Sequence, residues 1–216
     1  MAKKSAKSPD QLPEYRKRAI ERVREDIMTV AARLLATSGH RAVSMQDIAA
    51  ELGFTPSALY VYFDSKQAIF TELLQTVEAE LRQVFEEPAP AGADLRTRLR
   101  ALLERQLELT DRRRYAFMAF VELKASCDSG RSDEARFDET AYFRSLVEWF
   151  RAEVNPAEVG ELSPDDAAWL FIGICNGFFM RWMFEAQTGR MADQADAILD
   201  RFFYGVSGPD RREGSK

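Results

Sequence analysis

The chain has 216 residues, a formal net charge of −5 and 46% hydrophobic residues, which suits a soluble protein that can bury a core. One histidine and two cysteines exclude a disulfide framework and a cysteine–histidine metal cluster, so we expect neither a metal nor a cofactor. Without a histidine-centred dyad, a glycine-rich phosphate loop or a nucleophile motif, we do not expect an enzyme.

Charge is unevenly distributed along the chain. Residues 1–66 hold 11 Lys and Arg against 8 Asp and Glu, whereas the remainder holds 19 against 27. A basic N-terminal part beside an acidic remainder is compatible with a local phosphate-binding face. The lysines near the start precede no apolar segment, and the apolar run Ala167–Met180 is too short to span a bilayer, so we expect a cytoplasmic protein without membrane contact.

The first predicted elements are a flexible polar arm over residues 1–13 and a helix from Glu14 to Ser38. Apolar residues at helical spacing predict the buried side of this helix: Ile20, Val23, Ile27, Val30, Ala31 and Leu34. Its early turns are rich in basic residues, namely Arg16, Lys17, Arg18, Arg22 and Arg24. These cations either form a solvated face or attract a phosphate backbone.

Residues 44–66 predict two short helices joined by a tight turn. Met45, Ile48, Ala49 and Leu52 form the apolar stripe of the first helix. Local signals fix its ends: Ser44 and Asp47 can form a capping pair, and Gly53 can end the helix in the left-handed conformation. Thr55 followed by Pro56 then starts a second helix at once.

The second short helix is expected to run from Pro56 to Phe63. Leu59 and Phe63 face inward, which leaves an outer side formed by Ser57, Ala58, Tyr60, Val61 and Tyr62. Hydroxyls on such a helix could reach phosphates or base edges in a major groove, and Lys66 could hold a phosphate. The alternative is a helical hairpin inside a bundle, with half-buried tyrosines and a solvated lysine.

The rest of the chain is also predicted to be helical, so the fold class is all-α. We expect helices over Lys66–Glu86, Asp94–Thr110, Arg112–Ser126, Phe137–Val154, Pro164–Gln187 and Met191–Gly205. The Pro- and Gly-containing segment at residues 87–92 marks a linker or corner, residues 127–138 a polar loop, and residues 208–216 a flexible tail. In the helix that begins at Pro164, apolar residues occupy two sides, which predicts burial all round.

With these motifs, residues 16–75 resemble the tetracycline-repressor (TetR) family of bacterial transcriptional regulators. The matching residues are Asp47, Ile48, Ala49, Leu52, Gly53, Ser57, Leu59, Tyr60, Phe63, Lys66 and Phe70. The family most often has histidine where this chain has Tyr62. The resemblance implies DNA contacts by Ser44, Thr55, Ser57, Ala58, Tyr60, Tyr62 and Lys66.

The resemblance also implies a division of labour. Residues 14–66 would form a three-helix helix-turn-helix domain, and residues 67–207 a larger helical bundle for effector binding and dimerisation. Its last two helices would form a four-helix dimer interface with their symmetry mates; the alternative is that the helix from Pro164 is wholly internal. A homodimer would bind a palindromic operator in double-stranded DNA and repress transcription until a small, hydrophobic effector releases it. The alternatives are a transcriptional activator of the same fold and a helical interaction module that does not bind DNA. The candidate residues for binding the effector are Phe117, Phe120, Glu122, Tyr142, Trp149, Cys175, Asn176 and Phe179, with Arg181 a further candidate.

Overall fold

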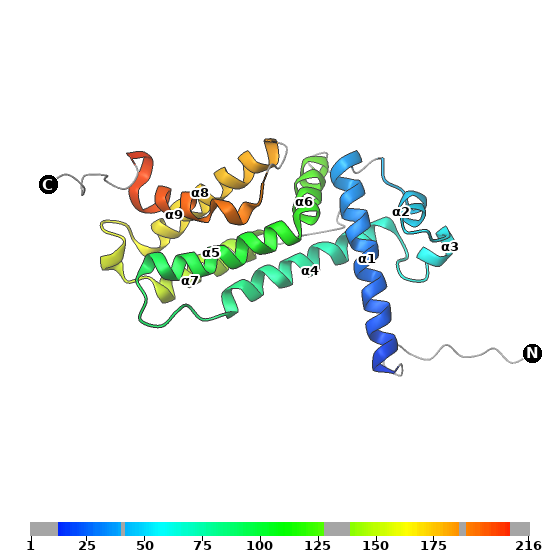
Figure 1. Ribbon diagram of the computed structural model, residues 1–216, viewed down its shortest axis with the longest axis horizontal. Helices are drawn as coiled ribbons and strands as arrows, with labels where there is room; N and C mark the ends of the chain where they lie inside the picture. Colours follow the sequence, from blue (N-terminus) through cyan, green and yellow to red (C-terminus); the bar gives the residue numbers. More distant parts are fainter. Residues whose placement is uncertain (1–12, 40–41, 128–138, 186–188, 208–216) are drawn as a thin grey trace, which may run out of the picture. The chain divides into compact units, whose positions relative to one another are not determined.

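The computed structural model describes residues 13–39, 42–127, 139–185 and 189–207, and its helices are labelled in Figure 1. The predicted flexible tail, and all but Pro13 of the predicted arm, lie outside these residues. The described parts are helical and contain no strand, which confirms the all-α class. Contacts divide the chain into two compact units: unit 1 comprises residues 1–75 and 115–136, and unit 2 comprises residues 76–114 and 137–216.

Unit 1 contains the short-helix segment. It consists of α1 (Glu14–Ser38), α2 (Met45–Glu51), α3 (Pro56–Leu59), the start of α4 (Lys66–Glu86) and most of α6 (Arg114–Cys127). In Figure 1, α2 and α3 lie beside each other next to α1. This unit extends beyond the predicted helix-turn-helix domain, because residues 67–75 and part of α6 pack with it.

Side chains from α1, α2, α3 and α4 pack together in the core of unit 1. Leu35, Ile48, Leu59 and Ile69 are fully buried, and Ala49 allows close packing of α2. The α1 stripe differs from the prediction: its buried residues are Ile27, Met28, Ala31, Ala32 and Leu35. Ile20 is 38% exposed, because the first turns of α1 extend past the helices that cover its second half.

Unit 2 contains the remaining helices: the end of α4, α5 (Leu95–Arg112), α7 (Glu139–Glu153), α8 (Pro164–Phe184) and α9 (Ala195–Tyr204). Three short 3₁₀ turns, η2 (Pro156–Glu158), η3 (Met191–Gln194) and η4 (Gly205–Ser207), connect or extend them. The predicted helix from Met191 to Gly205 is therefore divided into η3, α9 and the start of η4. From Lys66 onward the other predicted helices agree within three residues at each end, while the predicted ends Phe137 and Gln187 lie outside the described residues.

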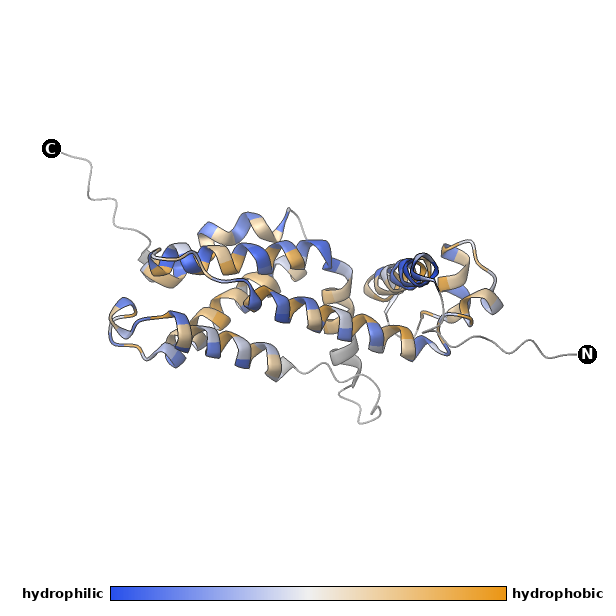
Figure 2. Ribbon diagram, turned by 90° about the horizontal axis from the view of Figure 1, so that it is seen from below, coloured by the Kyte–Doolittle hydropathy of each residue, from blue (hydrophilic) through white to orange (hydrophobic). Residues whose placement is uncertain are grey.

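Aromatic rings fill the centre of unit 2. Phe150 of α7 and Phe171 of α8 are fully buried, and Phe202 of α9 lies against both rings, at centroid distances of 6.2 and 5.3 Å. The helices of this unit carry both apolar and polar bands along their ribbons (Figure 2), as amphipathic helices with one buried side do. These rings are packing residues of the core.

One side of α8 has no covering helix within the described chain. Phe171, Ile172, Cys175 and Trp182 are buried, but the opposite side is exposed and largely apolar; it consists of Trp169, Leu170, Gly173, Asn176, Gly177, Met180 and Phe184. We call these seven residues the open face of α8. Within the single chain α8 is covered on one side only, so it is not a wholly internal core helix.

The apolar character of α8 is relevant to the expectation that the protein makes no membrane contact. The apolar run Ala167–Met180 lies within α8, which spans 21 residues. By length and composition it is the one helix among the described residues that could cross a membrane. A helix of a soluble protein that covers its apolar side against a partner passes the same test.

Candidate nucleic-acid interface

Local capping builds the two short helices of unit 1. The Ser44 hydroxyl accepts a hydrogen bond from the Asp47 amide at 3.2 Å, and the Asp47 carboxylate accepts one from the Ser44 amide at 2.8 Å. Gly53 follows with φ of 68°, a left-handed conformation that favours glycine. The capping pair and the glycine turn are thereby confirmed.

The second short helix begins as predicted but ends early. Thr55 caps it by accepting from the Ala58 amide at 3.3 Å, and Pro56 occupies its first turn. α-Helical geometry stops at Leu59, and the chain continues as a turn in which the amides of Val61 and Tyr62 donate to the carbonyls of Ala58 and Leu59. We call residues 57–62 the reading segment, since it contains the predicted outer side of this helix.

The reading segment presents hydroxyl-bearing and small side chains to solvent. Ser57 is exposed, Tyr60 is 51% exposed and Val61 is 79% exposed, while Leu59 and Phe63 are buried beneath them. Ala58 is half-buried. The expected division into an inner and an outer side is therefore present, even though the helix is shorter than predicted.

Two of the predicted DNA-contacting residues also make contacts inside the protein. The Tyr62 ring stacks on Phe54, with centroids 6.4 Å apart, and its side chain is half-buried. The Lys66 ammonium donates to the Val43 carbonyl at 2.8 Å, which ties the first turn of α4 to the residue before the α2 cap. Both residues thus have structural contacts within unit 1.

Arg24 was grouped with the basic early turns of α1, but its guanidinium is directed inward. Its Nε donates to Glu72 of α4 at 2.8 Å, a second nitrogen pairs with the other carboxylate oxygen, and a third donates to the Tyr62 carbonyl. Its guanidinium carbon lies 4.0 Å from the Phe63 ring centroid. No local pattern could reveal this role, because Glu72 is 48 residues away.

The capping pair allows a prediction about proton binding. Hydrogen bonds from the Ser44 side chain and backbone hold the pKa of Asp47 below its usual range. A depressed carboxylate pKa adds stability that is present above the unfolded-state pKa and is lost as pH falls through the folded-state pKa. We expect Ser44→Ala to move the Asp47 pKa back toward its ordinary value, measured by NMR titration of the carboxyl carbon; an unchanged pKa would contradict the capping role.

Comparison with known proteins agrees with this geometry. Residues 27–73, which include α2, α3 and the reading segment, match the family described as "Bacterial regulatory proteins, tetR family". The chain thus carries the DNA-binding domain of the TetR family. It is therefore a DNA-binding transcriptional regulator with a helix-turn-helix, as the sequence predicted. TetR-family regulators are soluble DNA-binding proteins, which agrees with the expected location.

Individual TetR-family relatives extend the comparison. The repressor KstR2 of Rhodococcus jostii is 34% identical over 88 residues, which cover 41% of this chain and 43% of KstR2. The chain thus spans less than half the length of that relative. The TetR-family regulator PfmR of Thermus thermophilus has a TM-score of 0.68 at 24% identity, covering 85% of this chain and 96% of PfmR. FadR of Bacillus subtilis, solved with stearoyl-CoA, has a TM-score of 0.64 at 17% identity, covering 84% and 98%.

The candidate effector residues of this chain lie in both units. Phe117, Phe120 and Glu122 are half-buried on α6 in unit 1, and Glu122 Oε1 lies 3.4 Å from where a Cβ on Gly39 would be. Unit 2 holds Tyr142, Trp149, Cys175, Asn176 and Phe179. Of these five, Asn176 is exposed on the open face of α8 and Trp149 and Cys175 are buried.

Three polar side chains meet inside unit 2. Gln106 of α5 and Cys175 of α8 both lie near the Tyr142 hydroxyl. Burial is the main cause that raises the pKa of Tyr142, while Cys175 also raises and Gln106 lowers this pKa. Burial raises the pKa of Cys175 to about 12. The Gln106 Oε1 atom is buried and accepts no hydrogen bond among the described residues. Sequence analysis included Tyr142 and Cys175 but missed Gln106.

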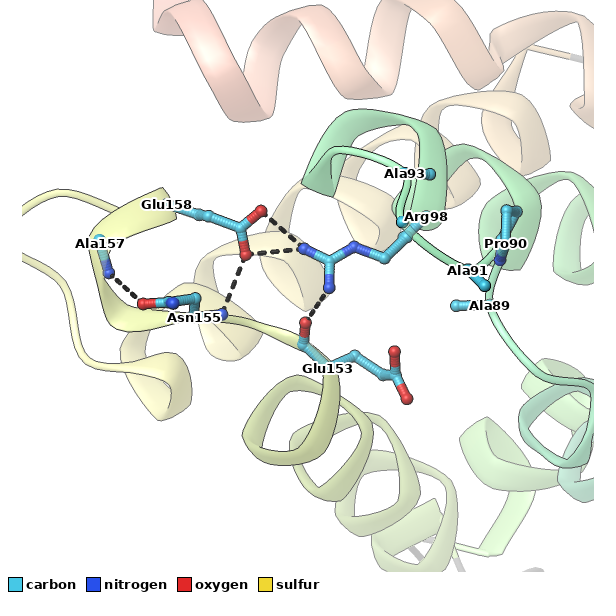
Figure 3. A pocket seen from close by; sticks show the side chains of 10 residues that line it. Ala89, Pro90, Ala91, Ala93, Arg98, Glu153, Asn155, Ala157 and Glu158 are labelled. Atoms are coloured by element: carbon cyan, nitrogen blue, oxygen red, sulfur yellow. Dashed lines mark hydrogen bonds and ion pairs between the residues drawn. The ribbon is translucent and has the colours of Figure 1, made fainter.

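An open hollow of about 510 Å³ also lies in unit 2, between the α4–α5 connection and η2. Figure 3 shows Arg98 reaching from α5 to Glu158, with both carboxylate oxygens 2.7 Å from one guanidinium nitrogen. The Asn155 amide and then Arg98 hold the pKa of Glu158 below its usual range. Its lining mixes alanine and proline with this ion pair, Glu153 and Asn155, which suits a hydrophobic effector less well than a mainly apolar pocket would.

Proposed function

We propose that the protein is a dimeric repressor that binds a near-palindromic operator and is released by a small hydrophobic effector. The main support for this proposal is the reading segment, whose Tyr60 and Val61 are exposed to solvent while Leu59 and Phe63 anchor it in the core. Two such segments related by a two-fold axis would enter successive major grooves on one face of the duplex. The family comparisons do not favour a helical module without DNA binding.

For the DNA contacts we propose the residues derived from the family resemblance. Ser57 and Tyr60 are the most accessible hydroxyls of the reading segment. Ser44, which is half-buried, and Thr55, which is exposed, cap the starts of α2 and α3. Ala58 offers a small apolar surface suited to a thymine methyl. Tyr62 and Lys66 would add phosphate contacts to the structural contacts that they already make.

Replacing one hydroxyl tests these contacts. We expect Tyr60→Phe to weaken operator binding by about 1 to 3 kcal/mol, since a hydrogen bond to a charged phosphate is lost. The measurement is the dissociation constant, by fluorescence anisotropy, for a duplex that the wild-type protein selects from a random library. Tyr204→Phe is the matched control, because Tyr204 is 45% exposed and lies in α9. Equal affinity of Tyr60→Phe and wild type would assign Tyr60 to packing.

We propose that the open face of α8 is the dimer interface. Its partner would be a second copy of this chain, because TetR-family homologues are dimers and a two-fold contact needs only one self-complementary surface. Gly173 and Gly177 lie one turn apart on this face, and a Cβ built on either meets no atom within 4 Å among the described residues, apart from its chain neighbours and the local α8 backbone. Two α8 helices could therefore approach closely at the glycines while Trp169 and Phe184 cover the flanks.

We propose that the effector binds inside the helical bundle of residues 67–207. The Gln106, Tyr142 and Cys175 cluster supports a ligand with a polar group and a long apolar part, since such sites are apolar with few polar groups. TetR-family homologues bind effectors such as acyl-CoA. The remaining candidate residues, on α6, α7 and α8, stay predictions.

Titration of the protein–operator complex tests release by an effector. Stearoyl-CoA and stearic acid are the probes, and operator affinity is measured at increasing probe concentration. A repressor of this kind needs an effector that binds one conformer more tightly than the other. To change the ratio of the two conformers from 1:99 to 99:1, the two binding free energies must differ by roughly 5.5 kcal/mol. Thermal shift measured in parallel reports binding itself. A probe that stabilises the protein while leaving operator affinity unchanged would contradict the switch.

A further inference from the structure

We infer that Arg24 and Glu72 are positioning residues for DNA recognition: together they fix the orientation of the reading segment without contacting DNA. This inference rests on the proposed DNA contacts of that segment. Arg24 comes from α1 and Glu72 from α4, and both belong to unit 1 with the segment that they hold. Neither residue is among the DNA contacts that the family resemblance implies.

The reading segment needs an external support. α3 has only four residues, and a helix this short has little stability of its own because nucleation is unfavourable. The turn that follows α3 reaches Tyr62, three residues beyond the last helical residue. Arg24 donates to the Tyr62 carbonyl, so a side chain from α1 holds the end of the reading segment.

The same guanidinium is itself held in one orientation. Glu72 accepts from two of its nitrogens, and the Phe63 ring lies against its face at 4.0 Å. Phe63 directly follows the reading segment and is 3% exposed. The Arg24 side chain therefore fixes both the Tyr62 carbonyl and the Phe63 ring. Holding these two groups sets the direction in which Tyr60 and Ser57 point.

Only arginine can make this set of contacts. Its planar fork pairs with a carboxylate through two parallel hydrogen bonds, and its flat face stacks on an aromatic ring. Lysine keeps the charge but cannot do both. The side chains of Arg24 and Glu72 are 29% and 35% exposed, and ion pairs near solvent add little to stability. The geometry thus points to an effect on DNA recognition that exceeds the effect on folding.

The test compares affinity for two duplexes, using the full chain. One is the duplex that wild-type protein selects from a random library, and the other has the same composition in shuffled order. We expect Arg24→Lys and Glu72→Gln each to lower the ratio of the two affinities about tenfold, because a tilted reading segment loses base contacts. Affinity for the shuffled duplex, which depends on phosphate attraction, should change by less than about threefold.

The double variant and a matched control sharpen the test. Arg24→Lys with Glu72→Gln should be no worse than the more affected single variant, since both changes interrupt one network. Arg33→Lys is the control: Arg33 also lies on α1 and pairs with a glutamate, Glu51 of α2, at 2.6 Å. We expect it to leave the affinity ratio unchanged. Circular dichroism melting verifies that each variant is folded at the assay temperature.

The outcomes separate the inference from the proposed function. If folded Arg24→Lys and Glu72→Gln retain the wild-type ratio, or if Arg33→Lys lowers it equally, the positioning role is wrong. If Arg24→Lys is unfolded, Glu72→Gln decides by the same criterion. If the wild-type protein selects no duplex at all, the proposed operator binding fails, and the positioning role fails with it.

Discussion

Gly177→Leu is expected to convert the protein to a monomer and to lower operator affinity by about 100-fold or more. Linking two half-site contacts in one dimer raises affinity by roughly 10²- to 10⁴-fold over a single contact, and a monomer loses this gain. Gly177 lies within the open face of α8, and among the described residues no atom beyond its chain neighbours and the local α8 backbone comes within 4 Å of an added Cβ. The leucine therefore fits the single chain but separates two α8 helices that meet at the glycines. Sedimentation velocity and anisotropy with the selected duplex measure the two effects.

Stability of the monomer should not fall in this variant. Leucine favours a helix over glycine by roughly 1 kcal/mol, so loss of dimer could not be attributed to unfolding of α8. Glu148→Leu is the matched control, because it places the same side chain at an exposed position of α7. A Gly177→Leu protein that remains a dimer with wild-type affinity would exclude the open face of α8 as the interface.

Phe150→Ala is expected to destabilise the protein by about 3 to 5 kcal/mol, the usual cost of removing a buried aromatic side chain. Phe150 is fully buried, and its ring lies against Trp149, Phe171 and Phe202 at centroid distances of 5.6, 5.8 and 6.2 Å. Three helices thus border the cavity that alanine would leave. Urea unfolding followed by circular dichroism measures the change in the free energy of unfolding.

An exposed aromatic residue provides the comparison for Phe150. Tyr15 is 67% exposed near the start of α1, and Tyr15→Ala should stay within about 0.5 kcal/mol of wild type, as surface changes usually do. A Phe150→Ala effect below about 1 kcal/mol would mean that the aromatic cluster repacks, which the close packing of cores disfavours.

The parts of the fold that sequence predicts are those with local causes. Ser44 with Asp47, Gly53, and Thr55 with Pro56 each act within three residues, so the starts of α2 and α3 and the turn between them could be read directly. The full length of α4 also followed from its own apolar spacing. Local rules overestimated α3, because the turn after Leu59 depends on the distant Arg24 as well as on neighbouring residues.

Features set by tertiary contacts could not be predicted in the same way. The buried side of α1 depends on which turns the other helices cover, so Ile20 is exposed although it fits the spacing. The role of Arg24 requires Glu72, which no sequence pattern connects to it. For α8, composition predicted an apolar helix, but only the fold shows that one side is covered by unit 2 and the other is open.

The burial of Cys175 has a chemical consequence for the protein. With a pKa of about 12, roughly one thiol in 10⁵ is ionised at pH 7, and only the thiolate reacts readily with oxidants and alkylating reagents. The sulfur is thereby protected as long as α5, α7 and α8 stay packed. Changes in cellular redox state should leave this residue untouched, and its labelling rate would report how often the bundle opens.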